Sequence, residues 1–274
     1  MITIGMQKGG VGKTTTAISL GIGLSEEGYR VLIVDTDPQG HVAKYLGSVD
    51  WDPNENGLFA WYINRRAWDS TILYPRPGNT NLAIMPIDRA GYMYLNETFE
   101  LNKNKFDSKL SIPTIETFER LFLEEAKRFH VVIFDTPPAL ASMTPTSAFR
   151  MSNLVIIPST MDYGSASEIG TTIQIALAAN PNIVYRILPT AFEAQTVVAK
   201  DVYMKINEEY PGLLFEPIPA DTKVKESRAS SMTIGEYAPG SRAFVGYTDD
   251  KGRTYGGYKK LIRRIGRYLE GLPL

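Results

Sequence analysis

Short apolar runs recur along the chain, and between them hydrophobic residues recur at helical spacing. Runs of this length bounded by turn residues are typical of buried strands. They lie at residues 1–6, 31–34, 81–86, 131–134, 154–158, 182–188 and 213–219. Helices are expected at residues 17–24, 58–63, 114–127, 165–179 and 255–269, with Thr114 as an N-cap. Strands that alternate with helices predict an α/β fold, with a doubly wound, mostly parallel sheet flanked by helices.

The stretch QKGGVGKTT at residues 7–15 lies between the first strand and the first helix. Its glycines let several backbone N–H groups converge on an anion, and the helix start adds unpaired N–H groups. Lys13 can reach the β- and γ-phosphates of a nucleotide, and the Thr14 hydroxyl can ligate Mg²⁺. The alternative is a glycine-rich turn with two solvated lysines. The predicted nucleotide-binding residues are Lys8, Gly9, Gly10, Val11, Gly12, Lys13, Thr14 and Thr15.

This loop departs from the strict pattern G-x-x-x-x-G-K-[ST], because residue 7 is glutamine and a second lysine, Lys8, precedes the glycines. The form K-G-G-V-G-K-T-T resembles that of the ParA/MinD family of deviant Walker A ATPases, and is closest to ParA-type partition ATPases. The resemblance implies a P-loop fold, and catalytic roles for Lys13 and for Lys8, which would cross a dimer interface to the partner's nucleotide. It covers roughly residues 1–47, 81–100 and 129–240.

Two carboxylates follow the second predicted strand, in the segment DTDPQG at residues 35–40. In an open parallel sheet the ligand lies beyond the carboxyl ends of the strands. A simple turn is the alternative, since Asp, Pro and Gly favour turns. The segment resembles the one that follows the second strand of ParA proteins. That match implies that Asp37 positions or activates the attacking water and that Asp35 supports Mg²⁺ or its waters.

A third carboxylate, Asp135, ends the apolar run VVIF at residues 131–134, and two prolines follow at 137–138. An apolar strand that ends in aspartate is a Walker B pattern, in which the aspartate holds Mg²⁺ through water. The pattern alone is weak, but the ParA/MinD family carries the same D-x-P-P ending. The resemblance also implies that adenine lies against the loops after the last two predicted strands, with Pro189, Thr190, Pro219 and Asp221 as candidates.

Residues 48–80 have the least regular pattern and predict an insertion. Its Trp61, Tyr62 and Trp68, with Arg65 and Arg66, could form a surface for a partner or nucleic acid. The alternative is that the aromatic rings pack the loop onto the core. A second polar stretch, residues 102–111, is expected to be a surface loop.

Basic residues gather in two places near the C-terminus. One is the helix predicted at about 255–270, where they recur on one face, and the other precedes it. The resemblance implies nonspecific DNA binding by such clusters, which would weaken with salt; a solvated helix face is the alternative for each. The candidate DNA-binding residues are Lys223, Lys225, Arg228, Lys259, Lys260, Arg263, Arg264 and Arg267. MinD proteins end instead in an amphipathic membrane helix, but here the apolar residues 261, 262 and 265 are expected to pack on the domain.

Composition narrows the range of possible protein classes and sites. The 274 residues are expected to form a single ATPase domain. A net charge of −1 offers no general attraction to nucleic acid, so DNA binding requires a local basic patch. No cysteine is present, which excludes disulfides, thiolate metal sites and a nitrogenase-reductase-like redox protein with a cysteine-bound cluster. No apolar run reaches the length of a membrane span, and no signal peptide is recognised.

The motifs and the resemblance to ParA proteins together imply an ATP- and Mg²⁺-dependent ATPase that forms a homodimer with ATP and binds nonspecific DNA in that state. The expected role is segregation of plasmid or chromosomal DNA, with hydrolysis slow and stimulated by a ParB-like or cargo adaptor protein. The expected location is the cytoplasm, on the nucleoid, without stable membrane insertion. Two alternatives stay open: positioning of a protein cargo such as a carboxysome over the nucleoid, and a MinD-like ATPase at the membrane.

Overall fold

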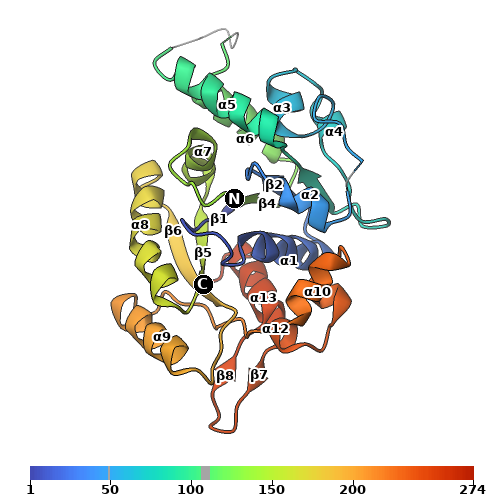
Figure 1. Ribbon diagram of the computed structural model, residues 1–274. Helices are drawn as coiled ribbons and strands as arrows, with labels where there is room; N and C mark the ends of the chain where they lie inside the picture. The colour runs from blue at the N-terminus through green and yellow to red at the C-terminus, as the bar shows by residue number, and fades with distance from the viewer. Residues whose placement is uncertain (49, 106–111) are drawn as a thin grey trace.

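A six-stranded parallel sheet forms the centre of the computed structural model, which describes residues 1–48, 50–105 and 112–274. The strand order is β3-β2-β4-β1-β5-β6, so the chain moves outward from β1 in both directions, as a doubly wound fold requires (Figure 1). The strands are β1 (Ile2–Ile4), β2 (Val31–Asp35), β3 (Leu82–Met85), β4 (Val131–Asp135), β5 (Leu154–Thr160) and β6 (Val184–Thr190). The predicted fold class is confirmed.

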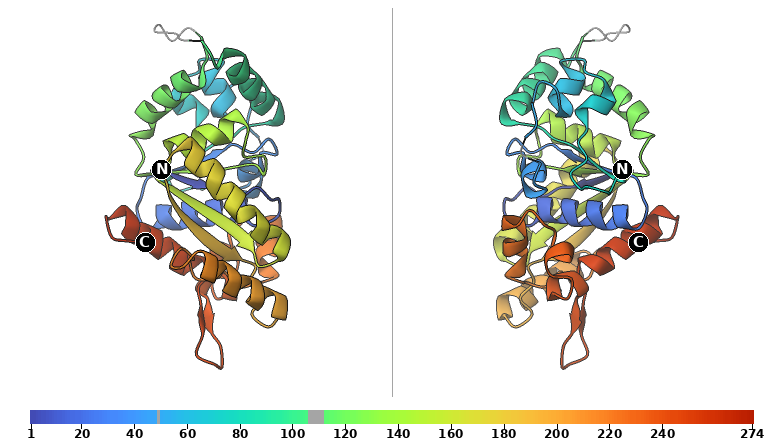
Figure 2. Two further views of the ribbon diagram at one scale, coloured as in Figure 1. Left: turned by 90° about the vertical axis from the view of Figure 1, so that its left-hand side faces the viewer. Right: turned by 90° about the vertical axis from the view of Figure 1, so that its right-hand side faces the viewer.

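Helices cover both faces of this sheet (Figure 2). Alternate strand residues point to opposite faces, which is why nearly continuous apolar runs are needed. On one face Ile4 and Ile33 pack in a core with α1 and α13, and on the other Val34 and Phe134 pack with α3 and α6. The helices are α1 (Lys13–Glu26), α2 (His41–Tyr45), α3 (Gly57–Tyr62), α4 (Trp68–Thr71), α5 (Arg89–Asn102), α6 (Ile115–Ala126), α7 (Met143–Met151), α8 (Tyr163–Ala179), α9 (Val197–Glu209), α10 (Lys223–Ala229), α11 (Ile234–Tyr237), α12 (Arg242–Val245) and α13 (Tyr258–Leu269).

The seventh predicted core strand, residues 213–219, is wrong as a regular strand. The segment does run beside β6, where Phe215 donates from its backbone N–H to Ile187 O at 2.8 Å and Ile218 donates to Pro189 O at 2.8 Å. Only isolated bridges form, at Leu214 and Pro219. Pro217 and Pro219 carry no backbone N–H, so the ladder cannot continue through them.

The C-terminal helix begins at Tyr258, not at residue 255. Residues 254–255 belong instead to β8 (Thr254–Tyr255), which pairs antiparallel with β7 (Tyr247–Thr248) in a hairpin that extends away from the body (Figures 1 and 2). A Cβ atom on Gly257 would lie 2.2 Å from Phe244 O, so the chain crosses α12 there in close contact before α13 starts. The apolar residues of α13 pack on the domain as predicted, since Leu261, Ile262 and Ile265 are buried.

The aromatic residues of the 48–80 segment are in the core. Trp61, Tyr62 and Trp68 are buried, and the Trp61 ring packs edge-on against Trp68 and Phe118 at centroid distances of 5.1 and 5.7 Å. The packing alternative is therefore confirmed for these rings, and they form no partner surface. α5, which the sequence pattern did not predict, starts where the Asp88 side chain accepts from Gly91 N at 2.8 Å. The loop expected at 102–111 begins at the end of α5, and residues 106–111 lie outside the described residues.

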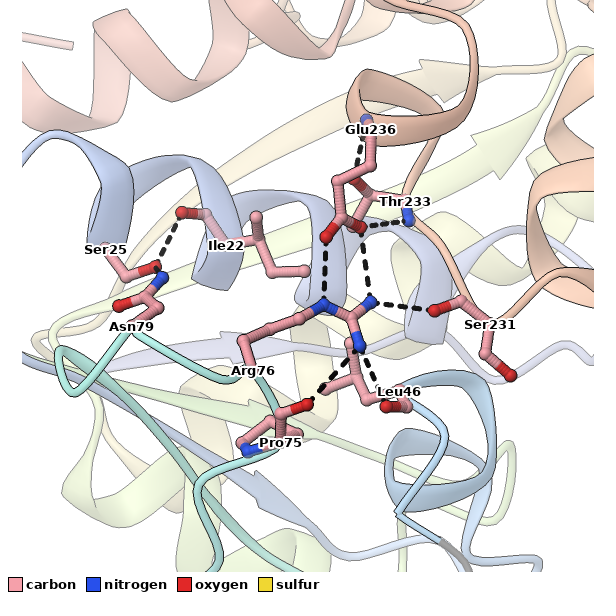
Figure 3. A network of polar contacts seen from close by, with 9 residues as sticks. All are labelled: Ile22, Ser25, Leu46, Pro75, Arg76, Asn79, Ser231, Thr233 and Glu236. Carbon is pink, nitrogen blue, oxygen red and sulfur yellow. Dashed lines mark hydrogen bonds and ion pairs between the residues drawn. The ribbon is translucent and has the colours of Figure 1, made fainter.

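Arg76 fastens the 48–80 segment to two other parts of the chain (Figure 3). Its guanidinium pairs with Glu236 on α11 at 2.9 Å and donates to the carbonyl oxygens of Leu46 and Ser231 at 2.9 and 2.8 Å. Leu46 follows α2, and Ser231 follows α10. One partly buried side chain thus ties α2 to α10. Among the described residues, no helix has the length and apolar character of a membrane span.

Candidate functional site

The glycine-rich loop leaves β1 and ends at Gly12, the residue before α1. Gly10 and Gly12 have φ angles of 78° and 93°, in the left-handed region that favours glycine. The Thr190 hydroxyl donates to Val11 O at 2.7 Å and fixes the loop against the end of β6. No side chain caps the first turn of α1, and no acidic residue lies in it. Its free N–H groups can therefore receive an anion.

A cavity of about 510 Å³ opens over this loop, beyond the carboxyl ends of β1, β2 and β4. This is where a doubly wound sheet holds its ligand. Side chains and backbone from six parts of the chain surround it: the loop and first turn of α1, the segment after β2, α2, α5, the segment after β4, and α10. The lining residues beyond the loop itself are Asp37, Pro38, Gln39, His41, Tyr45, Tyr92, Pro137, Pro138, Ala139 and Arg228.

The two lysines of the loop have different surroundings. Lys13 is buried, with 7% of its surface exposed, and its Nζ donates to Lys8 O at 2.7 Å. Burial lowers the pKa of Lys13, while the charges of Asp135 and Asp37 oppose that shift. Lys8 is half-exposed, and its Nζ lies 2.9 Å from Asp162 Oδ1, at the N-cap of α8. Lys13 is thus fixed towards the cavity, whereas Lys8 is held by a partner near the surface.

Asp35 and Asp37 lie in one segment, but their side chains have different surroundings. Asp35 is fully buried, and its two carboxylate oxygens accept from Asp37 N and Val42 N, each at 2.9 Å. Both oxygens of Asp35 therefore shape the segment after β2, and Asp35 does not line the cavity. Burial raises the pKa of Asp35 well above its usual value, and the facing Asp135 adds to the shift. Asp37 does line the cavity.

Asp135 lies directly opposite Asp35 in the β2–β4 register and is fully buried. Within the described part of the chain, neither of its carboxylate oxygens has a hydrogen-bond partner. Burial raises the pKa of Asp135 to about 7, the nearby Thr14 side chain and Lys13 lower it, and Asp37 raises it. A buried carboxylate without a partner, beside a threonine hydroxyl, fits a hydrated Mg²⁺, which keeps several waters and takes few protein ligands. No cluster of three or more His, Cys, Asp or Glu suited to a metal occurs among the described residues.

A second cavity of about 180 Å³ adjoins the first. Thr190, Pro219 and Asp221, three of the four residues predicted to contact the base, line it. Pro189 is not among its lining residues, and its carbonyl instead accepts from Ile218 N at 2.8 Å. The two cavities share Gly10, Gly12, Thr15 and Arg228. The two cavities are therefore adjacent, and the larger one alone is within the size range of small-molecule sites.

The eight predicted DNA-binding residues separate into three environments. Lys223 and Lys225 are exposed on α10, and Lys259, Arg263 and Arg267 are exposed on α13. Lys260 and Arg264 both pair with Glu216, at 3.1 and 3.2 Å. Arg228 lies in the wall of the two cavities.

Sequence patterns did not single out Asp162, Tyr45 or Tyr92. Asp162 had a detectable signal, because it follows a buried strand and precedes a helix, at the sheet edge where the ligand lies. The two tyrosines had none, since each lies on a helix whose orientation depends on packing across the sheet.

Fold and loop together define a P-loop nucleotide-binding protein. A family profile described as an AAA domain matches residues 1–185. The chromosome-partitioning ATPase Soj of Thermus thermophilus is 30% identical over 249 residues, covering 88% of this chain and 89% of that protein. The sporulation initiation inhibitor protein Soj of Bacillus subtilis is 29% identical over 260 residues, covering 91% and 95%.

A solved complex of McdA from Cyanothece with ATP has the same fold, with a TM-score of 0.74, 17% identity and coverage of 100% of this chain and 96% of that one. The chain therefore belongs to the AAA-domain family and, with its Soj relatives, to the ParA/MinD-type P-loop ATPases. The resemblance found in the motifs is confirmed.

Proposed function

We propose that the protein is a ParA-type ATPase that uses ATP and Mg²⁺ to control dimerisation and binding to nonspecific DNA, and so helps to segregate plasmid or chromosomal DNA. The observation that carries the proposal is that Lys13, Thr14 and Asp37 line one cavity over the glycine-rich loop. The buried, unpartnered carboxylate of Asp135 lies near enough for its charge to act on Lys13. Family membership and the ATP complex of McdA support the same ligand.

In the proposed binding mode, the loop N–H groups and Lys13 hold the β- and γ-phosphates, and Thr190, Pro219 and Asp221 border the base. Thr14 would ligate Mg²⁺ and Asp135 would hold it through water, while Asp35 acts indirectly by fixing the backbone of Asp37. Bound Mg²⁺ would neutralise charge on the phosphates.

For hydrolysis, Asp37 orients a water molecule in line with the γ-phosphorus. The new bond forms from water oxygen to phosphorus, the bond to the β–γ bridging oxygen breaks, and ADP and inorganic phosphate leave. Lys8 of each subunit crosses to the other's phosphates and stabilises charge there. Loss of the γ-phosphate removes contacts that hold the dimer. A ParB-like or cargo adaptor protein would accelerate this step.

For DNA binding, the exposed basic residues of α10 and α13 are the proposed contacts. Lys259, Arg263 and Arg267 form no ion pair among the described residues, so they are available to phosphates. The burial of Leu261, Ile262 and Ile265 against the domain argues against a membrane role for α13. The proposed location is the cytoplasm, on the nucleoid.

Binding to a nonspecific DNA duplex with ATP, ADP or no nucleotide tests the proposal, at several salt concentrations. The wild type is expected to bind only with ATP, Asp37→Ala to stay bound longer, and Lys8→Ala to lose both ATP-dependent dimerisation and DNA binding. Unchanged dimerisation and turnover in Lys8→Ala would contradict the mechanism in which Lys8 of each subunit contacts the phosphates of the other. ATP-dependent flotation with liposomes, without DNA binding, would favour the MinD-like alternative.

A further inference from the structure

Arg228 occupies the junction between the two cavities, opposite the glycine-rich loop. It lies near the end of α10 and is the one α10 residue that lines both spaces within the described part of the chain. Of the residues shared by the cavities, the other three, Gly10, Gly12 and Thr15, belong to the loop and α1. A ligand that fills both cavities must therefore lie against Arg228 and the start of α1.

The guanidinium of Arg228 is held in place but incompletely satisfied. Its Nη2 donates to Thr15 Oγ1, and its Cζ lies 5.6 Å from the centroid of the Tyr45 ring. Its Nε is buried and has no hydrogen-bond acceptor in the described part of the chain, and Arg228 forms no ion pair with a described carboxylate. A buried N–H donor without an acceptor is costly, and the fork of a guanidinium matches the oxygens of a phosphate.

Arg76 keeps this arrangement preformed. It binds the carbonyl of Leu46, next to Tyr45, and the carbonyl of Ser231, three residues beyond Arg228. The helices that carry Tyr45 and Arg228 are thus fixed relative to each other without a ligand. The guanidinium is then already in place when a phosphate arrives.

We infer that Arg228 binds the phosphate group nearest the nucleoside, the α-phosphate, and is a nucleotide-positioning residue rather than a DNA contact. Lys13 and Asp37 line only the larger cavity, which takes the terminal phosphates, whereas Pro219 and Asp221 line only the smaller one, which takes the base. Thr15 and Arg228 lie where the two meet. This inference rests on the proposed nucleotide binding.

A contact to the α-phosphate makes a prediction that a contact to the γ-phosphate does not. ADP and ATP share the α-phosphate, so loss of Arg228 must weaken both by the same factor. Hydrogen bonds to charged groups correspond to a change of roughly 10- to 100-fold in affinity. Titration calorimetry with Mg·ADP and Mg·ATP is expected to show such a loss for Arg228→Ala and a smaller one for Arg228→Lys, which retains the charge but not the fork.

Arg120→Ala is the matched control, because Arg120 is an exposed arginine on α6, and its affinities are expected to equal those of the wild type. Lys13→Ala measures the loss of a phosphate ligand in the larger cavity. Should Arg228→Ala fail to fold, as judged by its thermal unfolding, Arg228→Lys carries the test by the same criterion of equal loss.

Wild-type affinity in Arg228→Ala would overturn the inference, and so would a loss confined to ATP. Unchanged nucleotide affinity together with weaker DNA binding at saturating ATP would show that Arg228 contacts DNA and not the nucleotide. If the wild type itself bound neither nucleotide, the proposed function would be wrong, and the inference would fail with it. The wild-type titration thus separates the two failures.

Discussion

Lys8 of the glycine-rich loop is paired with Asp162 at the start of α8, with 2.9 Å between Nζ and Oδ1. The two side chains are 36% and 48% exposed, so solvent screens the pair and it stabilises the fold by less than about 1 kcal/mol. Asp162 also accepts from the hydroxyls of Thr160 and Ser165, at 2.6 and 2.9 Å, and from Ser165 N at 2.9 Å. Burial would raise the pKa of Asp162, but these bonds and Lys8 together lower it. Lys8 can therefore leave while Asp162 stays satisfied.

We expect Asp162→Asn to favour ATP-dependent dimerisation. Asparagine also serves as an N-cap, so α8 should be retained, with a stability change below about 1 kcal/mol. Without the ion pair, Lys8 is free to reach a partner's phosphates, and the concentration for half-dimerisation with ATP should fall by about 2- to 5-fold. Sedimentation velocity measures it. Lys8→Ala combined with Asp162→Asn should behave as Lys8→Ala alone, and weaker dimerisation of Asp162→Asn would contradict the expectation.

The raised pKa of Asp135 predicts that stability falls with rising pH in the absence of nucleotide and Mg²⁺. Its pKa is about 7 in the folded chain and near 3.8 when unfolded, so the folded state binds more protons between these values. The free energy of unfolding should therefore fall as pH rises from about 4 to 7. Asparagine cannot ionise, so Asp135→Asn should be more stable than the wild type at pH 8, by about 1–3 kcal/mol, and similar at pH 4.

Urea denaturation at pH 4, 6 and 8 measures this difference. Asp250→Asn is the control, because Asp250 is exposed in the turn of the β7–β8 hairpin. Parallel pH profiles for the wild type and Asp135→Asn would refute the assignment.

Loss of Arg76 should destabilise the fold strongly. Arg76→Ala removes the ion pair with Glu236 and three hydrogen bonds to carbonyl oxygens, and the paired side chains are only 19% and 23% exposed. Removal of one partner from such a pair leaves the other charge uncompensated, and we expect a loss of about 2–4 kcal/mol in unfolding free energy. Arg66→Ala is the control: its pair with Glu55 is about half-exposed, so the loss should stay below about 1 kcal/mol. Similar losses for both variants in urea titrations would contradict this account.

The two sets of basic residues on α13 should contribute unequally to DNA binding. Alanine at Lys259, Arg263 and Arg267 removes three exposed cations. The negative slope of log affinity against log salt should become shallower by about 3. Lys260 and Arg264 are occupied by Glu216, so alanine at both should lower the slope by less than about 1. Fluorescence anisotropy with a nonspecific duplex and ATP provides the slopes. An equal change for both variants would show that the Glu216 pairs do not limit binding.

The central strands and the phosphate loop could be predicted from sequence because local rules determine them. A strand buried on both faces must be apolar throughout, and the turn into α1 requires glycine at residues 10 and 12. Asp37 and Asp135 were predictable for the same reason, since ligands collect at the carboxyl ends of parallel strands. The roles of these residues follow from the proposed function, and the experiments above test them.

Contacts between distant segments were decided only by the tertiary structure. Arg228 looked like one member of a basic cluster, and only the packing of α10 beside α1 places it at Thr15, 213 residues away in sequence. Asp35 was expected to support Mg²⁺ or its waters, but its two oxygens accept from the backbone N–H groups of Asp37 and Val42 where the chain folds back. Sequence by itself determined the strands, the loop and the carboxylates at the strand ends, because these depend on neighbouring residues. Which charges face the cavity, and which are already paired, depended on helices packing across the sheet, and no local pattern encodes that.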